Sequence, residues 1–288
     1  MTITTKRLVP TLACIALASI GSAHAAEWSD TSLGYRYGQK FAEPYGPNDI
    51  SKSIYNLTHA SGYRYGSNFL SVDMLLADQQ DPSAPGSKSG SQETYVLYRN
   101  TLDIGKLSGN AIDAGPVRGV GATFGFDWNS KSDAGYNSKK RMLVAGPTLM
   151  FKVPGFLNVS LLALFESNAP FNAFSQTSVP RYTYKTHGML SGVWLIPFNA
   201  GVPLTFEGYA NFIGSKGKDE FGAQTKAETH VDLQVMYDLS EAVGAQKNTF
   251  KVGVEYEYWK NKFGNSDSGP AGKGATAKTP MVRAEYHF

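Results

Sequence analysis

The stretch that decides the fold of this chain is Phe250-Lys251-Val252-Gly253-Val254-Glu255-Tyr256-Glu257-Tyr258, in which apolar and polar side chains alternate. Successive side chains of a β-strand point to opposite faces, so a strand places the valines and tyrosines on one face and the lysine and glutamates on the other. An α-helix would scatter both sets around its axis. The same alternation returns in residues 230–239. The pattern therefore predicts strands with one apolar and one polar face.

Segments of this kind recur along the chain, separated by stretches rich in Gly, Pro, Asp, Asn and Ser that are typical of turns. Long polar connections follow odd-numbered segments, as at 79–91 and 261–279, and shorter ones follow most even-numbered segments, as at 153–156. Residues 104–116 are an exception, because they form a long connection where a short one is expected. The predicted strands number twelve and lie at approximately 28–39, 51–60, 68–78, 92–103, 117–129, 140–152, 157–166, 183–196, 203–213, 227–239, 249–260 and 280–288.

The beginning of the chain resembles a secretory signal peptide. Lys6 and Arg7 precede an apolar stretch, and small residues follow up to Ala-His-Ala at 23–25. We expect residues 1–25 to be the signal and residues 26–288 to form one domain. The single cysteine, Cys14, lies within the signal. The remaining chain therefore offers no disulfide, no thiol nucleophile and no cysteine zinc site.

The end of the chain, residues 281–288, reads Met-Val-Arg-Ala-Glu-Tyr-His-Phe and alternates up to a terminal aromatic residue. No apolar segment of helix length follows the signal, so this chain would cross a membrane by strands, whose backbone groups are all paired only in a closed barrel. An even strand number, short turns at the end that carries the termini and long loops at the other end are typical of outer-membrane barrels. We therefore predict an all-β, antiparallel up-and-down barrel in the bacterial outer membrane, with a soluble β-sandwich as the alternative.

The outer face of such a barrel contacts lipid. In the predicted register, the residues of the last strand that face the lipid are Val282, Ala284, Tyr286 and Phe288. The expected partners are outer-membrane lipid, lipopolysaccharide and the barrel-assembly machinery, which would receive the last strand with its terminal Phe288. Aromatic residues are expected at outward faces or strand ends, where they would form the interfacial girdles of a barrel; they are Trp28, Tyr35, Tyr37, Phe124, Phe126, Trp128, Trp194, Tyr256, Tyr258, Trp259, Tyr286 and Phe288.

The polar face of each strand would line the lumen, and twelve strands imply a narrow pore. Acidic, arginine, tyrosine and glutamine side chains are intermixed on this face, and such groups suit a flat, hydroxylated solute that needs both stacking and hydrogen bonds. The alternative is that lumen charges only pair with one another. The candidate lumen-lining residues are Arg36, Asp73, Tyr95, Arg99, Glu207, Tyr209, Asp232, Gln234, Glu255, Glu257, Arg283 and Glu285.

Other chemistry has weak support in the sequence. The net charge is +3, with cations and anions mixed along the chain, which indicates no nucleic-acid surface. No cofactor fingerprint or metal-ligand spacing is evident, and we expect no catalytic residue. The alternative from another class is a membrane hydrolase in which Asp232 orients His230 as a general base.

Residues 56–73, Asn-Leu-Thr-His-Ala-Ser-Gly-Tyr-Arg-Tyr-Gly-Ser-Asn-Phe-Leu-Ser-Val-Asp, resemble a turn and strand of the nucleoside-specific channel-forming outer-membrane family, the Tsx-like proteins, and residues 254–264 resemble its penultimate strand. The resemblance implies a monomeric twelve-stranded barrel that passes nucleosides and in some members serves as a phage or bacteriocin receptor. The leading hypothesis is a passive channel for nucleosides or similar small polar solutes. A pore without nucleoside preference and a receptor barrel with a closed lumen remain alternatives.

Overall fold

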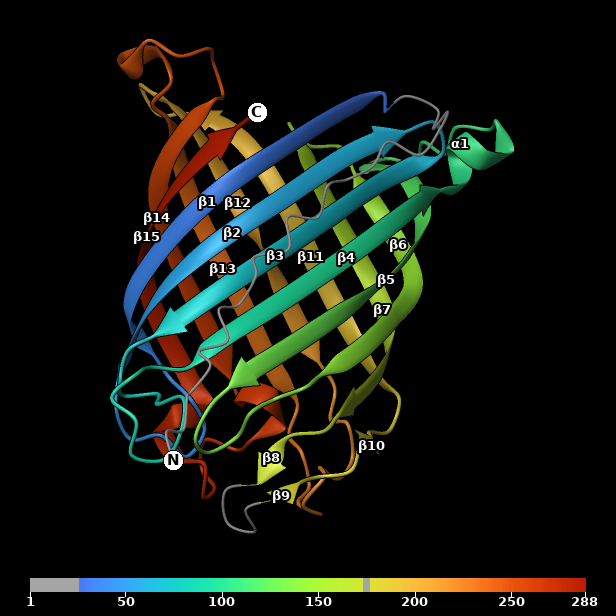
Figure 1. Cartoon of the computed structure of the whole chain (residues 1–288). Coiled ribbons are helices and arrows are strands. Elements are labelled where there is room, and N and C mark those ends of the chain that lie inside the picture. The colour runs from blue at the N-terminus through green and yellow to red at the C-terminus, as the bar shows by residue number, and fades with distance from the viewer. Residues whose placement is uncertain (1–25, 173–176) are drawn as a thin grey trace, which may run out of the picture.

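A computed structural model describes residues 26–172 and 177–288 (Figure 1), and the expected signal peptide lies outside them. The long strands are β1 (Trp28–Phe41), β2 (Ile50–Tyr63), β3 (Gly66–Ala77), β4 (Gln92–Asp103), β5 (Val117–Ser132), β6 (Arg141–Phe151), β7 (Phe156–Asn168), β11 (His187–Asn199), β12 (Pro203–Ile213), β13 (Glu228–Asp238), β14 (Phe250–Lys260) and β15 (Thr276–His287). The short elements are α1 (Ile104–Ser108), β8 (Phe171–Asn172), β9 (Thr177–Ser178), β10 (Tyr182–Thr183), η1 (Glu241–Val243), η2 (Lys262–Gly264) and η3 (Gly272–Ala275).

The long strands close into a barrel. Within the described residues, twelve antiparallel strands pair in chain order, and β15 returns to pair with β1 from Ser32↔His287 to Gly38↔Met281. The backbone N–H of Phe288 also donates to the carbonyl of Thr31 at 2.9 Å. The predicted fold class and the closure by the last strand are therefore confirmed.

The two ends of the barrel differ as the sequence predicts. The end that carries Trp28 and Phe288, called the termini end below, has short connections at 64–65, 152–155 and 200–202. The opposite end, called the loop end, carries the long connections at 78–91, 169–186, 214–227 and 261–275 (Figure 1). The exceptional connection after β4 contains α1, which the Asp103 side chain caps by accepting from the N–H of Lys106 at 3.1 Å. A local helix thus explains its length.

Two strand starts near the loop end differ from the sequence prediction. Tyr182–Thr183 forms β10 against the end of β7, and β11 begins only at His187. β15 begins at Thr276, earlier than predicted, because residues 276–279 pair with the last residues of β14. The residues before Thr279 are rich in glycine and lysine, which is typical of a loop, so the sequence did not predict this pairing.

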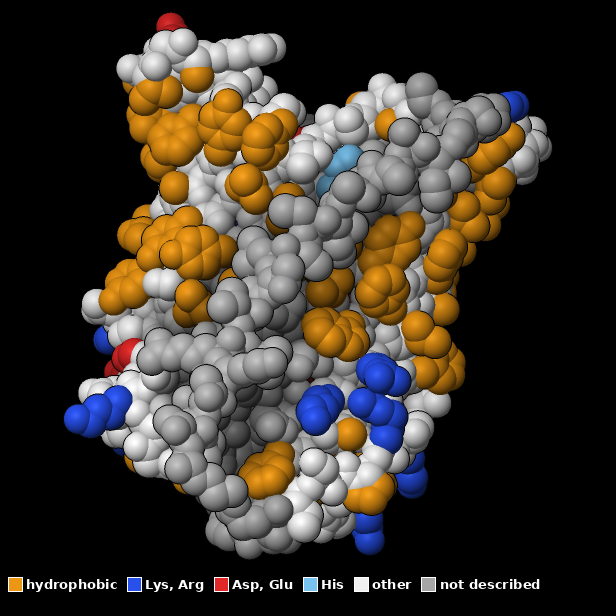
Figure 2. All heavy atoms as spheres, in the orientation of Figure 1, with side chains coloured by type: hydrophobic (Ala, Val, Ile, Leu, Met, Phe, Trp, Pro, Cys, Tyr) orange, Lys and Arg blue, Asp and Glu red, His pale blue; other side chains and the backbone are white. Residues whose placement is uncertain are grey.

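The alternation divides the strands into outward and inward faces. Val282 and Tyr286 are 58% and 49% exposed, whereas Glu285 between them is buried. Hydrophobic side chains cover much of the outer surface, and Lys and Arg gather towards the loop end (Figure 2). None of the helices in the described part of the chain is long and apolar enough to cross a membrane.

Two of the aromatic residues expected at strand ends point inward. Trp259 shares the inward face of β14 with Glu255 and Glu257, and Trp28 lies opposite Gly62 on the inward face at the rim. Both lie near strand ends, as expected, and the period of two places Trp259 with Glu257 and Trp28 with Arg36 on the inward face. Part of the inward face is also apolar rather than polar; its buried cluster is Met142, Val144, Leu162, Leu164 and Met189.

A tight turn between β6 and β7 depends on Gly155, whose φ is +75°. A Cβ atom there would lie 2.1 Å from the carbonyl oxygen of Leu195. Gly201 also has a left-handed φ, +86°, but open space around it. We expect Gly201→Ala to lower the free energy of unfolding by about 1 kcal/mol through backbone strain alone, and Gly155→Ala to lower it by more because the neighbouring strand must also shift. Denaturant unfolding of both variants measures this, and equal losses would contradict it.

Candidate functional site in the barrel lumen

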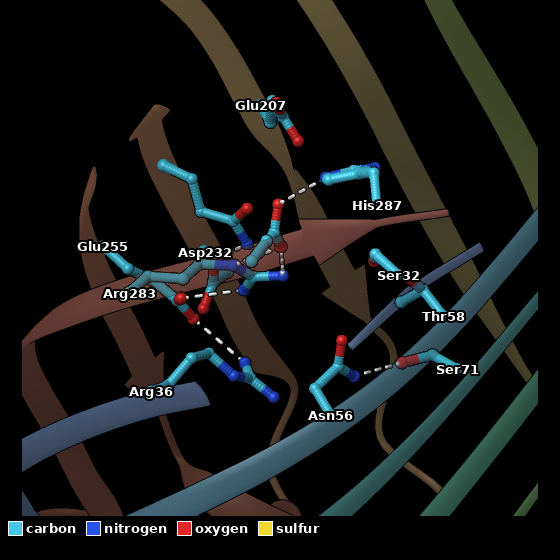
Figure 3. Close-up of polar contacts among 12 residues, drawn as sticks. Ser32, Arg36, Asn56, Thr58, Ser71, Glu207, Asp232, Glu255, Arg283 and His287 are labelled. Carbon is cyan, nitrogen blue, oxygen red and sulfur yellow. Dashed lines mark hydrogen bonds and ion pairs between the residues drawn. The ribbon is translucent and has the colours of Figure 1, made fainter. Parts of the chain in front are cut away.

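An ion-pair network on the inward face of one wall joins strands that are not direct neighbours (Figure 3). Arg36 of β1 binds Asp73 of β3 at 2.6 Å and Glu255 of β14 at 3.0 Å. Glu255 also accepts from Arg283 at 2.9 Å, and Arg283 binds Glu285 at 2.5 Å. Each arginine thus has two carboxylates. The Glu255 side chain is fully buried at the centre of this Arg36–Glu255–Arg283 cluster.

The network continues towards the termini end through polar groups. The Glu285 carboxylate lies 3.3 Å from Nε2 of His287, whose Nδ1 lies 2.9 Å from Asp30. On the other side, Asn56 donates to Asp73 at 2.5 Å and to Ser71 at 3.1 Å. Five of the predicted lumen residues therefore converge: Arg36, Asp73, Glu255, Arg283 and Glu285.

Most of the remaining predicted lumen residues belong to other groups. Arg99 binds Asp127 at 2.5 Å, and the Tyr95 hydroxyl donates to the same carboxylate at 2.5 Å. Asp232 is buried beside the Arg36–Glu255–Arg283 cluster, where it interacts with Glu255 and Arg36, and it also accepts from the amide of Gln234 at 3.0 Å. Glu207 stands apart from the cluster in Figure 3 and accepts from the Thr205 hydroxyl at 2.6 Å.

Tyr209 and Glu257 flank an aromatic stack on the inward face. The ring of His230 stacks on Trp259 at 4.0 Å with an interplanar angle of 8°. Tyr209 lies 3.0 Å from Nε2 of His230, and Glu257 lies 3.9 Å from it. Because His230 pairs with Tyr209 while Asp232 pairs with Gln234, the structure does not form the His230–Asp232 pair that the hydrolase alternative requires.

A row of hydroxyls that the sequence reasoning missed runs across β4 to β7, away from the Arg36–Glu255–Arg283 cluster. Thr101 bonds Thr123 at 2.8 Å, Thr123 bonds Thr148 at 2.6 Å, and Thr148 bonds Ser160 at 2.7 Å. These residues come from β4, β5, β6 and β7 in turn, and together they are called the hydroxyl row below. The alternation places each of these residues at an inward position of its strand, but short hydroxyl side chains mark the polar face of a strand less clearly than charged side chains do.

Phe69 is a second residue that the sequence reasoning did not single out as lumen-facing. It lies four residues before Asp73 on the same face of β3 and is 41% exposed. Its cross-strand partners are Ala60 and Arg99. The period of two places it inward as soon as Asp73 is placed inward. An open aromatic ring therefore faces the lumen beside an arginine.

At the loop end, Glu43 of the β1–β2 loop draws three lysines together. Its Oε1 lies 2.7 Å from Lys52, 3.1 Å from Lys262 and 3.6 Å from Lys131. Lys131 also binds Asp81 at 2.9 Å. Burial opposes the ionisation of Glu43, but the charges of these lysines outweigh it and hold the pKa of Glu43 well below its usual range. This Glu43–lysine cluster ties loops 42–49, 78–91 and 261–275 across the mouth.

A second contact joins the other loops. Glu220 accepts hydrogen bonds from the hydroxyls of Tyr136 and Tyr184. Burial, and then the charge of Glu220, raises the pKa of Tyr184 well above its usual value, so this phenol stays protonated as a donor. Lys216 binds Glu166 at 2.9 Å close by. Loops from both halves of the barrel therefore narrow its loop end.

We expect Glu43→Gln to release the 42–49 loop, because the amide removes the charge that holds three lysines. Hydrogen exchange of that loop at pH 7 should become about 10-fold faster. In the unchanged protein the protection should persist from pH 7 to pH 5 and be lost only in stronger acid, since a lowered pKa stabilises the contact above the unfolded value of about 4.3. Asp49→Asn, which removes an exposed charge from the same loop, is the control. Equal exchange in the two variants would contradict the prediction.

Within residues 26–172 and 177–288, no group of three or more His, Cys, Asp or Glu side chains is arranged to hold a metal ion.

Comparison with known proteins gives only distant similarities. No family model matches the sequence, and no curated protein matches it. Among solved structures, the chain is similar to the KdgM porin, with 12% identity, coverage of 89% of this chain and 99% of that one, and a TM-score of 0.42. It is also similar to the translocator domain of the autotransporter NalP from Neisseria meningitidis, with 12% identity, coverage of 92% and 90%, and a TM-score of 0.48. The outer-membrane protein OpdK from Pseudomonas aeruginosa has 10% identity, coverage of 91% and 99%, and a TM-score of 0.25. At these scores the fold rests on the strand pairing itself.

Proposed function

We propose that this protein is a passive channel of the bacterial outer membrane for nucleosides or similar small polar solutes. The observation that carries the proposal is the division of the lumen. The Arg36–Glu255–Arg283 cluster pairs its charges internally on one wall, and the buried hydroxyls of the row, bonded to one another, add no charge on the other. Such a lumen favours a polar solute without net charge, which meets no unpaired ion of the cluster.

The closed barrel and its surface support the membrane location. Every long strand is paired on both sides, and large apolar residues point outward, as lipid requires. Residues 26–288 would be the single barrel domain that remains after removal of the signal. The exposed Phe288 at the end of β15 suits recognition by the barrel-assembly machinery, and the basic residues near the loop end suit contact with lipopolysaccharide (Figure 2). The protein would act as a monomer.

The preference for nucleosides rests on the aromatic groups. Phe69 presents an exposed ring within the lumen beside Arg99, and such a ring is suited to stacking on a base. A sugar of similar size would gain less from this stacking. This difference distinguishes the nucleoside channel from a general pore.

Liposome swelling with the purified full chain tests the proposal. Nucleosides should enter faster than sugars of matched size, and adenosine should block the ion current of single channels in a saturable way. Equal swelling rates would leave a pore without nucleoside preference. Zero conductance in planar bilayers would contradict the channel itself and favour a receptor barrel with a closed lumen.

A further inference from the structure

The outer wall of the barrel carries a polar pocket near the termini end. It has a volume of about 370 Å³ and is lined by Tyr63, Arg64, Tyr65, Asn68 and Asn100. Asn68 and Asn100 form a cross-strand pair between β3 and β4. They share the outward face with Leu70 and Val72, whereas Phe69 and Asp73 point into the lumen. This pocket therefore lies outside the channel and has no part in the proposed transport.

The asparagine oxygens of the pocket already accept hydrogen bonds, whereas one amide nitrogen is free to donate. The side-chain oxygen of Asn68 accepts from the Tyr98 hydroxyl at 2.7 Å and from the Asn100 amide at 2.8 Å. The side-chain oxygen of Asn100 accepts from the Tyr63 hydroxyl at 3.1 Å. Among the described residues, the amide nitrogen of Asn68 donates to no protein group. The bonds among these side chains use only the oxygen of the Asn68 amide, so its –NH₂ group remains a free donor.

Arg64 adds a positive charge to these donors. It occupies the turn between β2 and β3, is exposed, and lies over the ring of Tyr65 at 5.1 Å. No carboxylate of the described chain lies within ion-pair distance of its guanidinium. A planar cation and a free amide donor at one edge of a pocket select an anionic oxygen ligand, and a phosphate group matches the fork of an arginine best.

The position of the pocket on the outer wall favours the phosphate group of a lipid. The outward positions that follow Asn68 along β3, at Leu70 and Val72, are apolar, and Val96 lies opposite Val72 on β4. A ligand with a phosphate in the pocket and acyl chains along this wall would match both surfaces. The tyrosines beside the pocket suit the interface between lipid headgroups and tails, where tyrosine rings are common.

We propose that Arg64, Asn68 and Asn100 form a binding site for the phosphodiester headgroup of a membrane phospholipid on the outer wall of the barrel. The proposal rests on the membrane location given above but not on the solute of the channel. With the termini in the periplasm, the site faces the inner, periplasmic leaflet. The bound lipid would satisfy polar groups that face outward in an otherwise apolar wall.

Native mass spectrometry of the full chain tests the site with dioleoyl phosphatidylglycerol, digalactosyl diacylglycerol carrying the same acyl chains, and inorganic phosphate. The phospholipid should remain bound, and the galactolipid and inorganic phosphate should not. Arg64→Gln should weaken retention of the phospholipid about 10-fold. Arg118→Gln, at an exposed arginine near the same end of the barrel and outside the pocket, should retain the phospholipid like the unchanged protein.

Three results would overturn the proposal: equal retention in Arg64→Gln and the unchanged protein, equal retention of the galactolipid, or binding of inorganic phosphate as tight as that of the phospholipid. The last result would indicate a free-anion site. Channel conductance of the same samples separates the two proposals. Arg64→Gln should conduct like the unchanged protein, and absence of conductance in every sample would contradict the channel while leaving the lipid result intact.

Discussion

Replacement of Glu255 by glutamine should lower the free energy of unfolding by about 3 kcal/mol, the largest stability loss we expect of any lumen substitution. The Glu255 carboxylate is fully buried and binds both Arg36 and Arg283. Its loss leaves two buried guanidinium groups with one carboxylate each, Asp73 and Glu285. The expected loss lies at the lower end of the range for broken buried ion pairs because these partners remain.

Denaturant unfolding of the barrel in lipid vesicles measures this loss. Glu207→Gln is the matched control, because Glu207 is also an inward carboxylate but accepts only from the Thr205 hydroxyl and forms no ion pair with any described residue. Glu255→Gln also removes one negative charge from the lumen. The reversal potential of this variant in a salt gradient should therefore shift towards anion selectivity. Stability losses within 0.5 kcal/mol of each other would contradict a central role for Glu255.

Phe69→Ala should weaken the block of the channel by adenosine about 10-fold, since stacking of a base on an aromatic ring contributes about 1–3 kcal/mol. Phe69 and Phe124 are similarly exposed, at 41% and 45%. The ring of Phe69 faces the lumen, whereas the ring of Phe124 faces outward. Phe124→Ala removes the same atoms from the other side of the wall and is the control.

Single-channel recording over a range of adenosine concentrations gives the block constant of each variant. The open-channel conductance of Phe69→Ala should not fall, because the substitution only removes atoms from the lumen. Equal block constants for the two variants would contradict stacking at Phe69. That outcome would favour a pore in which hydrogen bonds alone hold the solute.

The assignment of residues to the outward face follows from the local alternation of side chains. The alternation at Val252, Val254 and Tyr256 assigns these residues to one face whatever the rest of the chain does, because the side-chain period of a strand is two. The same period places Trp259 inward with Glu255 and Glu257. The pattern did not predict the start of β15, because residues 276–279 carry too few large apolar side chains to mark a strand.

The number and order of the strands, the closure of the barrel at Phe288 and the inward position of the charged residues follow from the sequence. These features depend on a local period and on the need to pair every backbone group. Which inward groups meet follows from the three-dimensional fold. Arg36 reaches Glu255 across an intervening strand, and Glu43 reaches Lys262 between distant loops. Such contacts depend on the stagger and curvature of the closed sheet and on loop conformation, which alternation along a single strand does not encode.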